Sequence, residues 1–173
     1  MWGINCLVRS FLLAQAIHPI DLTLQWVGSD YDLVVTAHTA GDGSILLHCL
    51  LQSSKVTGLI VTGSMAPNFI FDVSIISDQS KMIGLDSLWN ITYRGVSNGE
   101  VPHLPKPRSW RLTSEPSPLD SGYVRSGYQG ELDAFVRAIT DGAKGPPNFR
   151  EELPVYRAID RIEALVKARL AKG

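Results

Sequence analysis

Apolar residues near the start of the chain repeat with the spacing of a helix. The stripe has intervals of four, three, four and three positions and consists of Leu13, Ile17, Ile20, Leu24 and Val27. Gly28 follows the stripe, at the kind of position where a glycine ends many helices. Pro19 lies inside the pattern and lacks a backbone donor, so we expect the helix to bend there or to begin a new first turn.

From Tyr31 to Tyr93 the period changes to the alternation that is typical of strands. We expect five strands, at residues 32–39, 44–53, 56–65, 69–77 and 81–93. The connections between them are too short for crossover helices, so neighbouring strands should pair antiparallel in a meander. Asp42-Gly43 suits the first hairpin turn, because glycine readily adopts positive φ.

Several of these strands carry apolar residues on both faces. In the segment 44–53, Leu46 and Leu50 alternate with the residues of the opposite face, which are Ile45, Leu47, Cys49 and Leu51. One face of an antiparallel sheet normally meets water, so a second apolar face needs a cover. We expect helices on one face and a second copy of the chain on the other, which makes the protein a homo-oligomer.

The last part of the chain combines an irregular segment with two helices. Residues 95–127 include five prolines and are typical of an extended, ordered excursion. Helical stripes follow at residues 132–139 and 155–166. Together the patterns predict a single α+β domain over residues 1–173, with an antiparallel meander sheet of about five or more strands and helices packed on one face.

Composition narrows the choice of partner. The 173 residues include 16 basic and 17 acidic side chains, so the formal net charge of −1 gives no electrostatic footprint for nucleic acid or an anionic membrane surface. No apolar stretch reaches the roughly 18 residues that span a bilayer, and we interpret residues 1–16 as structure rather than a leader. Two cysteines, Cys6 and Cys49, favour reduced thiols in the cytoplasm.

The sequence lacks the usual signals of two kinds of site, a dinucleotide-binding loop and a metal site. The only Gly-x-Gly, Gly41-Asp42-Gly43, falls in the expected hairpin rather than between a strand and a helix, so the sequence offers no cradle for a dinucleotide. His38 and His48 have no Cys, Asp or Glu at ligand spacing. We therefore expect no metal site, and we assign these two histidines structural or interface roles.

The best candidate for chemistry lies in the first helix. His18 and Asp21 are three positions apart and Gln25 is seven from His18, so all three border the apolar stripe on one edge. An imidazole there could take or give a proton near neutral pH, with the carboxylate fixing its tautomer. The plainer alternative is a helix-edge histidine paired with Asp21 for structure, and spacing alone leaves both open.

Side chains of later segments could line a substrate pocket. As substrate-binding residues we select one helix residue, three aromatic side chains and one cation: Gln25, Trp89, Trp110, Tyr128 and Arg125. Each has a common alternative, because aromatic side chains usually pack in cores and loop cations are usually solvated.

Several ordered blocks resemble the C-terminal domain of the Gfo/Idh/MocA oxidoreductases. They lie at residues 15–21 (QAIHPID), 58–60, 66–68, 83–85, 128–135 (YQGELDAF) and 153–160 (LPVYRAID). The resemblance rests on the order of these blocks around the meander and covers almost the whole chain.

The resemblance implies a role for each part. Members of the family combine an N-terminal Rossmann domain, which binds NAD or NADP, with a C-terminal α+β domain that carries the substrate pocket and whose open sheet commonly serves oligomerisation. His18 matches the family's helix histidine that assists proton transfer, and Asp21 matches the acidic residue after it. The glycine-rich loop and the lysine of the family's Glu-Lys-Pro motif have no counterpart here, and Ala14 stands where many relatives carry a polar residue.

We therefore expect a stand-alone substrate-binding and oligomerising module of a split or truncated oxidoreductase that acts on a small metabolite. No cofactor should bind this chain alone, and NAD or NADP would enter with a separate dinucleotide-binding subunit. One alternative is a cofactor-independent isomerase, dehydratase or cyclase that uses His18 as general acid or base. A second alternative is a non-catalytic structural assembly protein.

Overall fold

A computed structural model describes residues 4–39, 44–63, 70–79, 81–86, 90–96, 109–114, 128–142 and 149–170. The chain falls into two compact units, of which the first comprises Met1–Ser114 with Pro154–Gly173 and the second comprises Glu115–Leu153. The first unit contains the sheet and the helices that cover it. The described residues of the second unit form one further helix and the first residues of the C-terminal helix.

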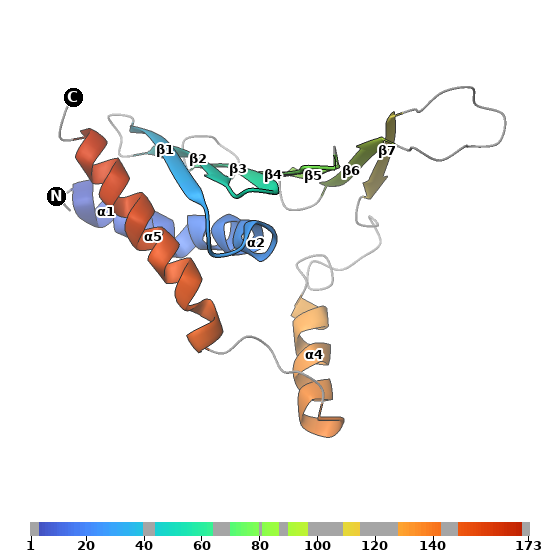
Figure 1. Ribbon diagram of the computed structural model, residues 1–173. Helices are drawn as coiled ribbons and strands as arrows, with labels where there is room; N and C mark the ends of the chain where they lie inside the picture. The colour runs from blue at the N-terminus through green and yellow to red at the C-terminus, as the bar shows by residue number, and fades with distance from the viewer. Residues whose placement is uncertain are drawn as a thin grey trace. The chain divides into compact units, whose positions relative to one another are not determined.

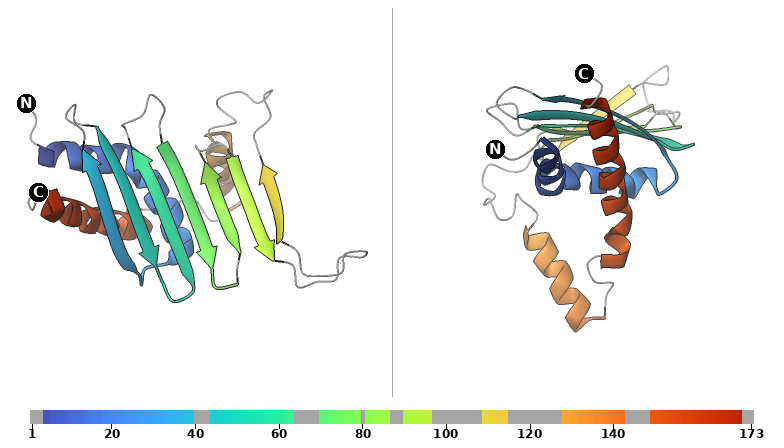
Figure 2. Two further views of the ribbon diagram at one scale, coloured as in Figure 1. Left: turned by 90° about the horizontal axis from the view of Figure 1, so that it is seen from above. Right: turned by 90° about the vertical axis from the view of Figure 1, so that its left-hand side faces the viewer.

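The first unit is built on a seven-stranded antiparallel sheet in which consecutive strands are neighbours (Figure 2). The strands are β1 (Asp32–Thr39), β2 (Ile45–Gln52), β3 (Val56–Gly63), β4 (Ile70–Ser77), β5 (Met82–Asp86), β6 (Asn90–Val96) and β7 (Ser109–Ser114). The predicted α+β meander is thus confirmed, but two details of the prediction were wrong. The strand expected at 81–93 is the pair β5 and β6, and part of the expected excursion at 95–127 is β7, because three more short strands extend the same meander.

The N-terminal helix is continuous but changes its winding in the middle. It consists of α1 (Ile4–Phe11), the π-helical turn η1 (Leu12–Ala16) and α2 (Ile17–Val27). A proline in a helix lacks the N–H that would bind the carbonyl four residues earlier, and its ring crowds that carbonyl. For Pro19 that residue is Gln15, which lies in η1, so the wider turn gives the proline ring its space. Figure 2 shows α1 and α2 running in different directions, so the expected bend is present and lies at the π-turn just before Pro19.

The π-turn also moves the apolar stripe. An extra residue in one turn rotates everything before it around the helix axis, and the buried residues accordingly follow intervals of mostly four: Val8, Leu12, Ala16, Ile20, Leu24 and Val27. Leu13, which we expected in the stripe, is 38% exposed. The predicted stripe is correct from Ile20 onward, Ile17 is partly buried against the core, and only Leu13, inside the π-turn, was wrong.

The inner face of the sheet packs under the helices. Val35, Cys49, Ile60 and Val73 stand side by side across β1 to β4, and none is more than 8% exposed. Figure 1 shows α1, α2 and α5 (Phe149–Leu170) on one side of the sheet. The part of α5 that belongs to the first unit adds five buried residues to this core: Val155, Ala158, Ile159, Ile162 and Val166.

Charged side chains join α1 to α5 at the rim of this core. Arg9 Nη1 donates to Asp160 Oδ1 at 2.5 Å and to Glu163 Oε2 at 2.8 Å. Lys167 Nζ lies 2.7 Å from the other oxygen of Glu163. The hydrogen bond from Lys167, together with that from Arg9, holds the pKa of Glu163 below its usual range. The carboxylate thus stays ionised between two cations on the helix surface.

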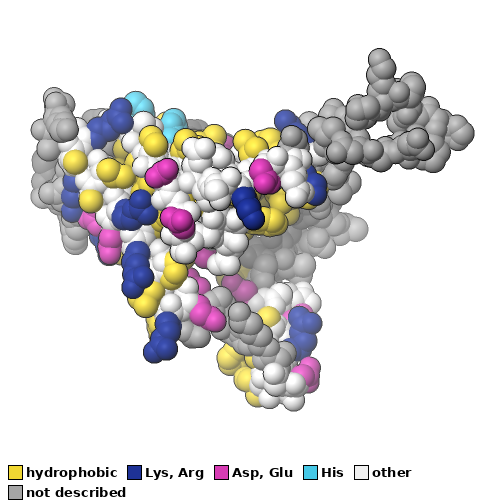
Figure 3. All heavy atoms as spheres, viewed as in Figure 1, with side chains coloured by type: hydrophobic (Ala, Val, Ile, Leu, Met, Phe, Trp, Pro, Cys, Tyr) yellow, Lys and Arg dark blue, Asp and Glu magenta, His cyan; other side chains and the backbone are white. Residues whose placement is uncertain are grey.

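The outer face of the sheet has no such cover among the described residues. Val34, Leu50 and Leu59 form one row across β1 to β3, and Val34 is 58% and Leu59 41% exposed. Figure 3 shows hydrophobic and histidine side chains along this side of the sheet. A shallow cavity of about 340 Å³ lies on this face over β4 to β6, where Gly84 has no side chain.

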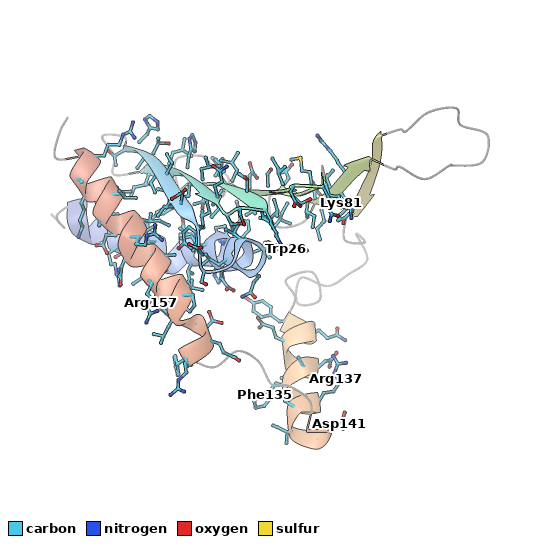
Figure 4. All side chains as sticks on the ribbon, in the orientation of Figure 1. Trp26, Lys81, Phe135, Arg137, Asp141 and Arg157 are labelled. Atoms are coloured by element: carbon cyan, nitrogen blue, oxygen red, sulfur yellow. The ribbon has the colours of Figure 1, made fainter. Side chains whose placement is uncertain are left out.

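The second unit contains α4 (Tyr128–Thr140), an amphipathic helix that buries none of its residues. Its large apolar side chains are each about half exposed or more: Tyr128, Leu132, Phe135, Val136 and Ile139. Figure 4 shows Phe135 and Arg137 on opposite sides of the helix. Helical periodicity at 132–139 is confirmed, while Leu132, Phe135, Val136 and Ile139 stay exposed within the described part of this unit.

Among the residues that the structure describes, no helix is both long and apolar enough to cross a membrane.

Candidate functional site

The exposed face of α2 gathers the three helix residues selected from the sequence. His18, Asp21 and Gln25 all lie on the side of α2 that points away from the sheet, where His18 and Gln25 are exposed. Gln25 Nε2 donates a hydrogen bond of 3.1 Å to Asp21 Oδ1. The predicted shared edge is therefore present, and two of its three side chains are bonded to each other.

The imidazole of His18 is left accessible. Within the described residues it has no hydrogen-bond partner, and the carboxylate that we expected to fix its tautomer is bonded to Gln25 instead. A free, exposed imidazole can exchange a proton with a bound molecule, and its orientation would be set by that molecule rather than by Asp21.

Two apolar side chains complete this face, and the sequence analysis overlooked them. Leu22 and Trp26 follow His18 at intervals of four and are 36% and 52% exposed. Residues four apart lie one above the other on a helix, so His18, Leu22 and Trp26 form a single line. The signal was visible in the spacing, because a second apolar line opposite the core stripe is unusual on a solvated helix.

Close packing against the sheet fixes where α2 lies. Thr23 is fully buried, and its hydroxyl donates to the carbonyl oxygen of Pro19 at 2.7 Å, which leaves its methyl group facing Gly58 of β3. A side chain at position 58 would overlap Thr23 Cγ2 and also contact Val27. The helix therefore sits directly on the backbone of β3, and its opposite face, with His18, is held in one orientation.

An open groove of about 710 Å³ adjoins the C-terminal end of α2. It lies between the α2–β1 connection and the β2–β3 turn, and Trp26, Asp30, Asp32 and Lys55 contribute to its walls. Trp26 thus belongs both to the exposed face of α2 and to the groove. Eight residues of helix separate it from His18, a rise of roughly 12 Å. No sequence motif marks the groove, because its walls come from turns far apart in the chain.

The described structure does not place the other predicted substrate-binding residues relative to this face. Trp89 and Arg125 lie outside the described residues. Trp110 lies on β7, of which the structure describes the backbone course. Tyr128 begins α4 in the second unit and is 56% exposed. Their assignment to the substrate pocket therefore stays a prediction.

The remaining histidines and Cys49 lie away from His18. His38 and His48 belong to the outer face of the sheet, whereas α2 packs on the inner face, so neither meets His18 across the sheet. Cys49 is fully buried and unpaired, and burial raises the pKa of its thiol to about 12. Its sulfur is a protonated core atom rather than a nucleophile or ligand.

The described residues do not fit a dinucleotide in the way that Rossmann domains hold one. That mode needs a parallel strand–helix–strand unit with a glycine-rich turn at the helix N-terminus. All six strand pairings described here are antiparallel and none encloses a helix.

The chain is similar to part of a known enzyme structure. A dehydrogenase from Chromobacterium violaceum matches 95% of this chain with 36% sequence identity and a TM-score of 0.74. The match covers 48% of the dehydrogenase, so this chain spans about half of its length. No protein-family model and no curated protein matches the sequence. The fold and more than a third of the aligned residues are thus those of one part of a dehydrogenase.

Proposed function

We propose that this chain is the substrate-binding and oligomerising part of a nicotinamide-dependent dehydrogenase of the Gfo/Idh/MocA type, which acts on a small metabolite. The observation that carries the proposal is the similarity of almost the whole chain to half of a dehydrogenase. The family resemblance of the sequence blocks at 15–21 and 128–135 points to the same class of enzyme.

In this proposal His18 is the residue that moves a proton. It lies exposed on a rigidly seated helix, and its imidazole has no competing partner among the described residues. It would take the proton of a substrate hydroxyl during oxidation and return it during reduction. Asp21 and Gln25, which are bonded to each other, would form a polar wall beside the substrate rather than part of a relay.

A dinucleotide-binding subunit is the proposed partner. More than half of the similar dehydrogenase lies outside the match. In this proposal a separate subunit takes the place of that unmatched part and covers surfaces that are exposed in this chain. Leu22 and Trp26 beside His18 give such a partner an apolar contact, and the apolar face of α4 gives it another. Burying His18 between two proteins would also exclude water from the reacting groups.

The outer face of the sheet is the proposed surface for self-association. Exposed Val34 and Leu59 flank half-buried Leu50 in the middle of that face, and apolar surface of this kind gains about 25 cal/mol per Å² when a second copy covers it. The oligomer would leave the exposed face of α2 free, because that face lies on the other side of the sheet.

A chimaera tests the catalytic part of the proposal. These 173 residues would replace the matched half of the Chromobacterium violaceum dehydrogenase, and reduction of NAD or NADP would be followed over a panel of small hydroxylated metabolites. We expect turnover with at least one of them. His18→Ala should lower kcat by roughly 10²- to 10⁴-fold, the usual contribution of a general acid or base, without lowering the melting temperature.

Asp21→Asn is the matched variant and should lower kcat less than His18→Ala. A fully active His18→Ala chimaera with a reduced melting temperature would assign the histidine to structure. A folded chimaera that reduces neither nucleotide with any member of the panel would count against the dehydrogenase role, and turnover without nicotinamide would favour the cofactor-independent alternative.

A further inference from the structure

Two histidine rings meet on the outer face of the sheet, at its β1 edge. His38 of β1 pairs with Leu46, and His48 of β2 pairs with Thr36, so the two histidines are diagonal neighbours on the same face. Their ring centroids are 6.3 Å apart and the ring planes are inclined by 65°. Ten positions separate them in the sequence, which is why spacing alone gave no sign of a pair.

The pair is accessible in a single copy of the chain, and a second copy that packs on Leu50 and Leu59 would have to leave this β1 corner of the face open. His38 is exposed and His48 half-buried, and neither forms a hydrogen bond or ion pair with the described residues. The side chains that flank them on this face are those of Thr36, Leu46 and Val61, none of which carries a charge. Arg169 is the cation that the structure places against the same strand, β1, where its Nη1 donates to the carbonyl oxygen of Val35 at 3.4 Å rather than to either ring. No described carboxylate bonds to either ring.

We propose that His38 and His48 form a chelating site for one divalent transition-metal ion, of the kind that imidazole favours: Cu²⁺, Ni²⁺ or Zn²⁺. Neutral imidazole nitrogen is a good ligand for all three ions, whereas Mg²⁺ and Ca²⁺ prefer oxygen. The site is separate from His18 and does not rest on the proposed dehydrogenase role.

The ring geometry is close to what chelation needs. With metal–nitrogen distances of about 2.1 Å, two imidazoles on one tetrahedral ion have centroids roughly 5 Å apart. The rings of His38 and His48 would approach each other by about 1 Å, which rotation of exposed His38 about its side-chain bonds supplies. The strands themselves need not move, because the hairpin already sets the two side chains on one face.

Two protein ligands leave coordination positions open. No group of three or more His, Cys, Asp or Glu side chains in the described part of the chain is arranged to hold a metal. The remaining positions would be filled by water or by an exchangeable ligand, so the ion would be bound reversibly rather than as a closed structural centre.

Isothermal titration of the untagged chain with CuCl₂, NiCl₂ and ZnCl₂ tests the site, with MgCl₂ as the negative control. All proteins would carry Cys6→Ser, so that this thiol cannot bind the added metal. We expect one ion per chain, with Cu²⁺ tightest and no binding of Mg²⁺. His38→Asn and His48→Asn should each weaken binding on the order of 10- to 100-fold, because the second imidazole no longer acts as an intramolecular ligand.

His18→Asn is the matched control, since it removes an exposed histidine from another element and should leave the affinity unchanged. Circular dichroism of each variant would confirm that the sheet is intact. Equal binding by the wild-type chain and the His38→Asn variant, or an equal loss in His18→Asn, would overturn the assignment, as would the absence of binding to all three ions.

Discussion

The two faces of one sheet, built by the same strands, differ sharply in their surroundings. Ile60 of β3 is fully buried under the helices, while its neighbour Leu59 points to the other face and is 41% exposed. Both are large aliphatic residues in one apolar run, residues 59–61. Apolar alternation therefore identifies a strand, but what covers each face depends on elements elsewhere in the chain or in another chain.

The inner face owes its cover to two segments far apart in the sequence, the N-terminal helix and α5. Helix α2 rests on β3 at Gly58, η1 lies beside it, and α5 returns from the C-terminus to close the core. The outer face receives no described segment of its own chain. We infer from this difference that the inner face stabilises the fold and that the outer face is available for association.

Truncation of adjacent residues should show the largest contrast between the faces. Ile60→Ala removes atoms from a fully buried site and should lower the free energy of unfolding by about 2–5 kcal/mol. Leu59→Ala, its matched control on the same strand, should cost about 1 kcal/mol or less. Urea unfolding, at a protein concentration low enough that the result no longer depends on it, measures both. Equal losses would mean that the faces do not differ in this way.

Two glycines, one on each face of the sheet, test the same contrast between the faces when a methyl group is added instead of removed. Gly58→Ala would push a methyl group against Thr23 and should cost about 1–3 kcal/mol, whereas Gly84→Ala on the outer face meets nothing closer than 3.9 Å and should be neutral or slightly stabilising. Adding Thr23→Ser to Gly58→Ala should recover most of the loss, because serine keeps the hydroxyl but lacks the clashing methyl group. Thermal unfolding checks all three, and a Gly58→Ala variant as stable as Gly84→Ala would contradict the close approach of α2.

The smallest expected effect concerns the charged rim of the inner core. The folded-state pKa of Glu163 is lowered, first by the hydrogen bond from Lys167, so its ionisation stabilises the fold above the usual carboxyl pKa and ceases to do so as the pH falls through the lowered value. Glu163→Gln should therefore cost about 1 kcal/mol or less at pH 7 and nothing at strongly acidic pH. Melting temperatures across this range test it, with Asp160→Asn, whose side chain is 64% exposed, as the weaker control. A difference in melting temperature between the wild-type chain and Glu163→Gln that persisted at strongly acidic pH would contradict the electrostatic cause.

Local rules predicted most of the sheet. The first strand was expected at 32–39 and β1 is Asp32–Thr39, because alternation and short turns specify a hairpin without help from distant residues. The split between β5 and β6 was missed since apolar and polar residues continue through residues 81–93 without a clear turn signal.

The candidate site was only partly predictable. Helical spacing placed His18, Asp21 and Gln25 on one face, as the structure has them. It could not show that Asp21 bonds to Gln25, which depends on side-chain rotamers, nor that the bend near Pro19 is made by a π-turn. The groove beside Trp26 was not predictable for another reason, since it forms only where residues 26–32 and residues 52–56 meet at one end of the sheet.

The claim that the outer face is an association surface is tested most directly by sedimentation velocity at micromolar concentration. We predict that the wild-type chain sediments with a multiple of its 19.0 kDa mass and that Leu59→Lys shifts it to 19.0 kDa. Leu165→Lys, which charges a leucine of similar exposure on α5, should leave the mass unchanged. A wild-type chain that is monomeric under these conditions, or equal behaviour of the two lysine variants, would contradict the account.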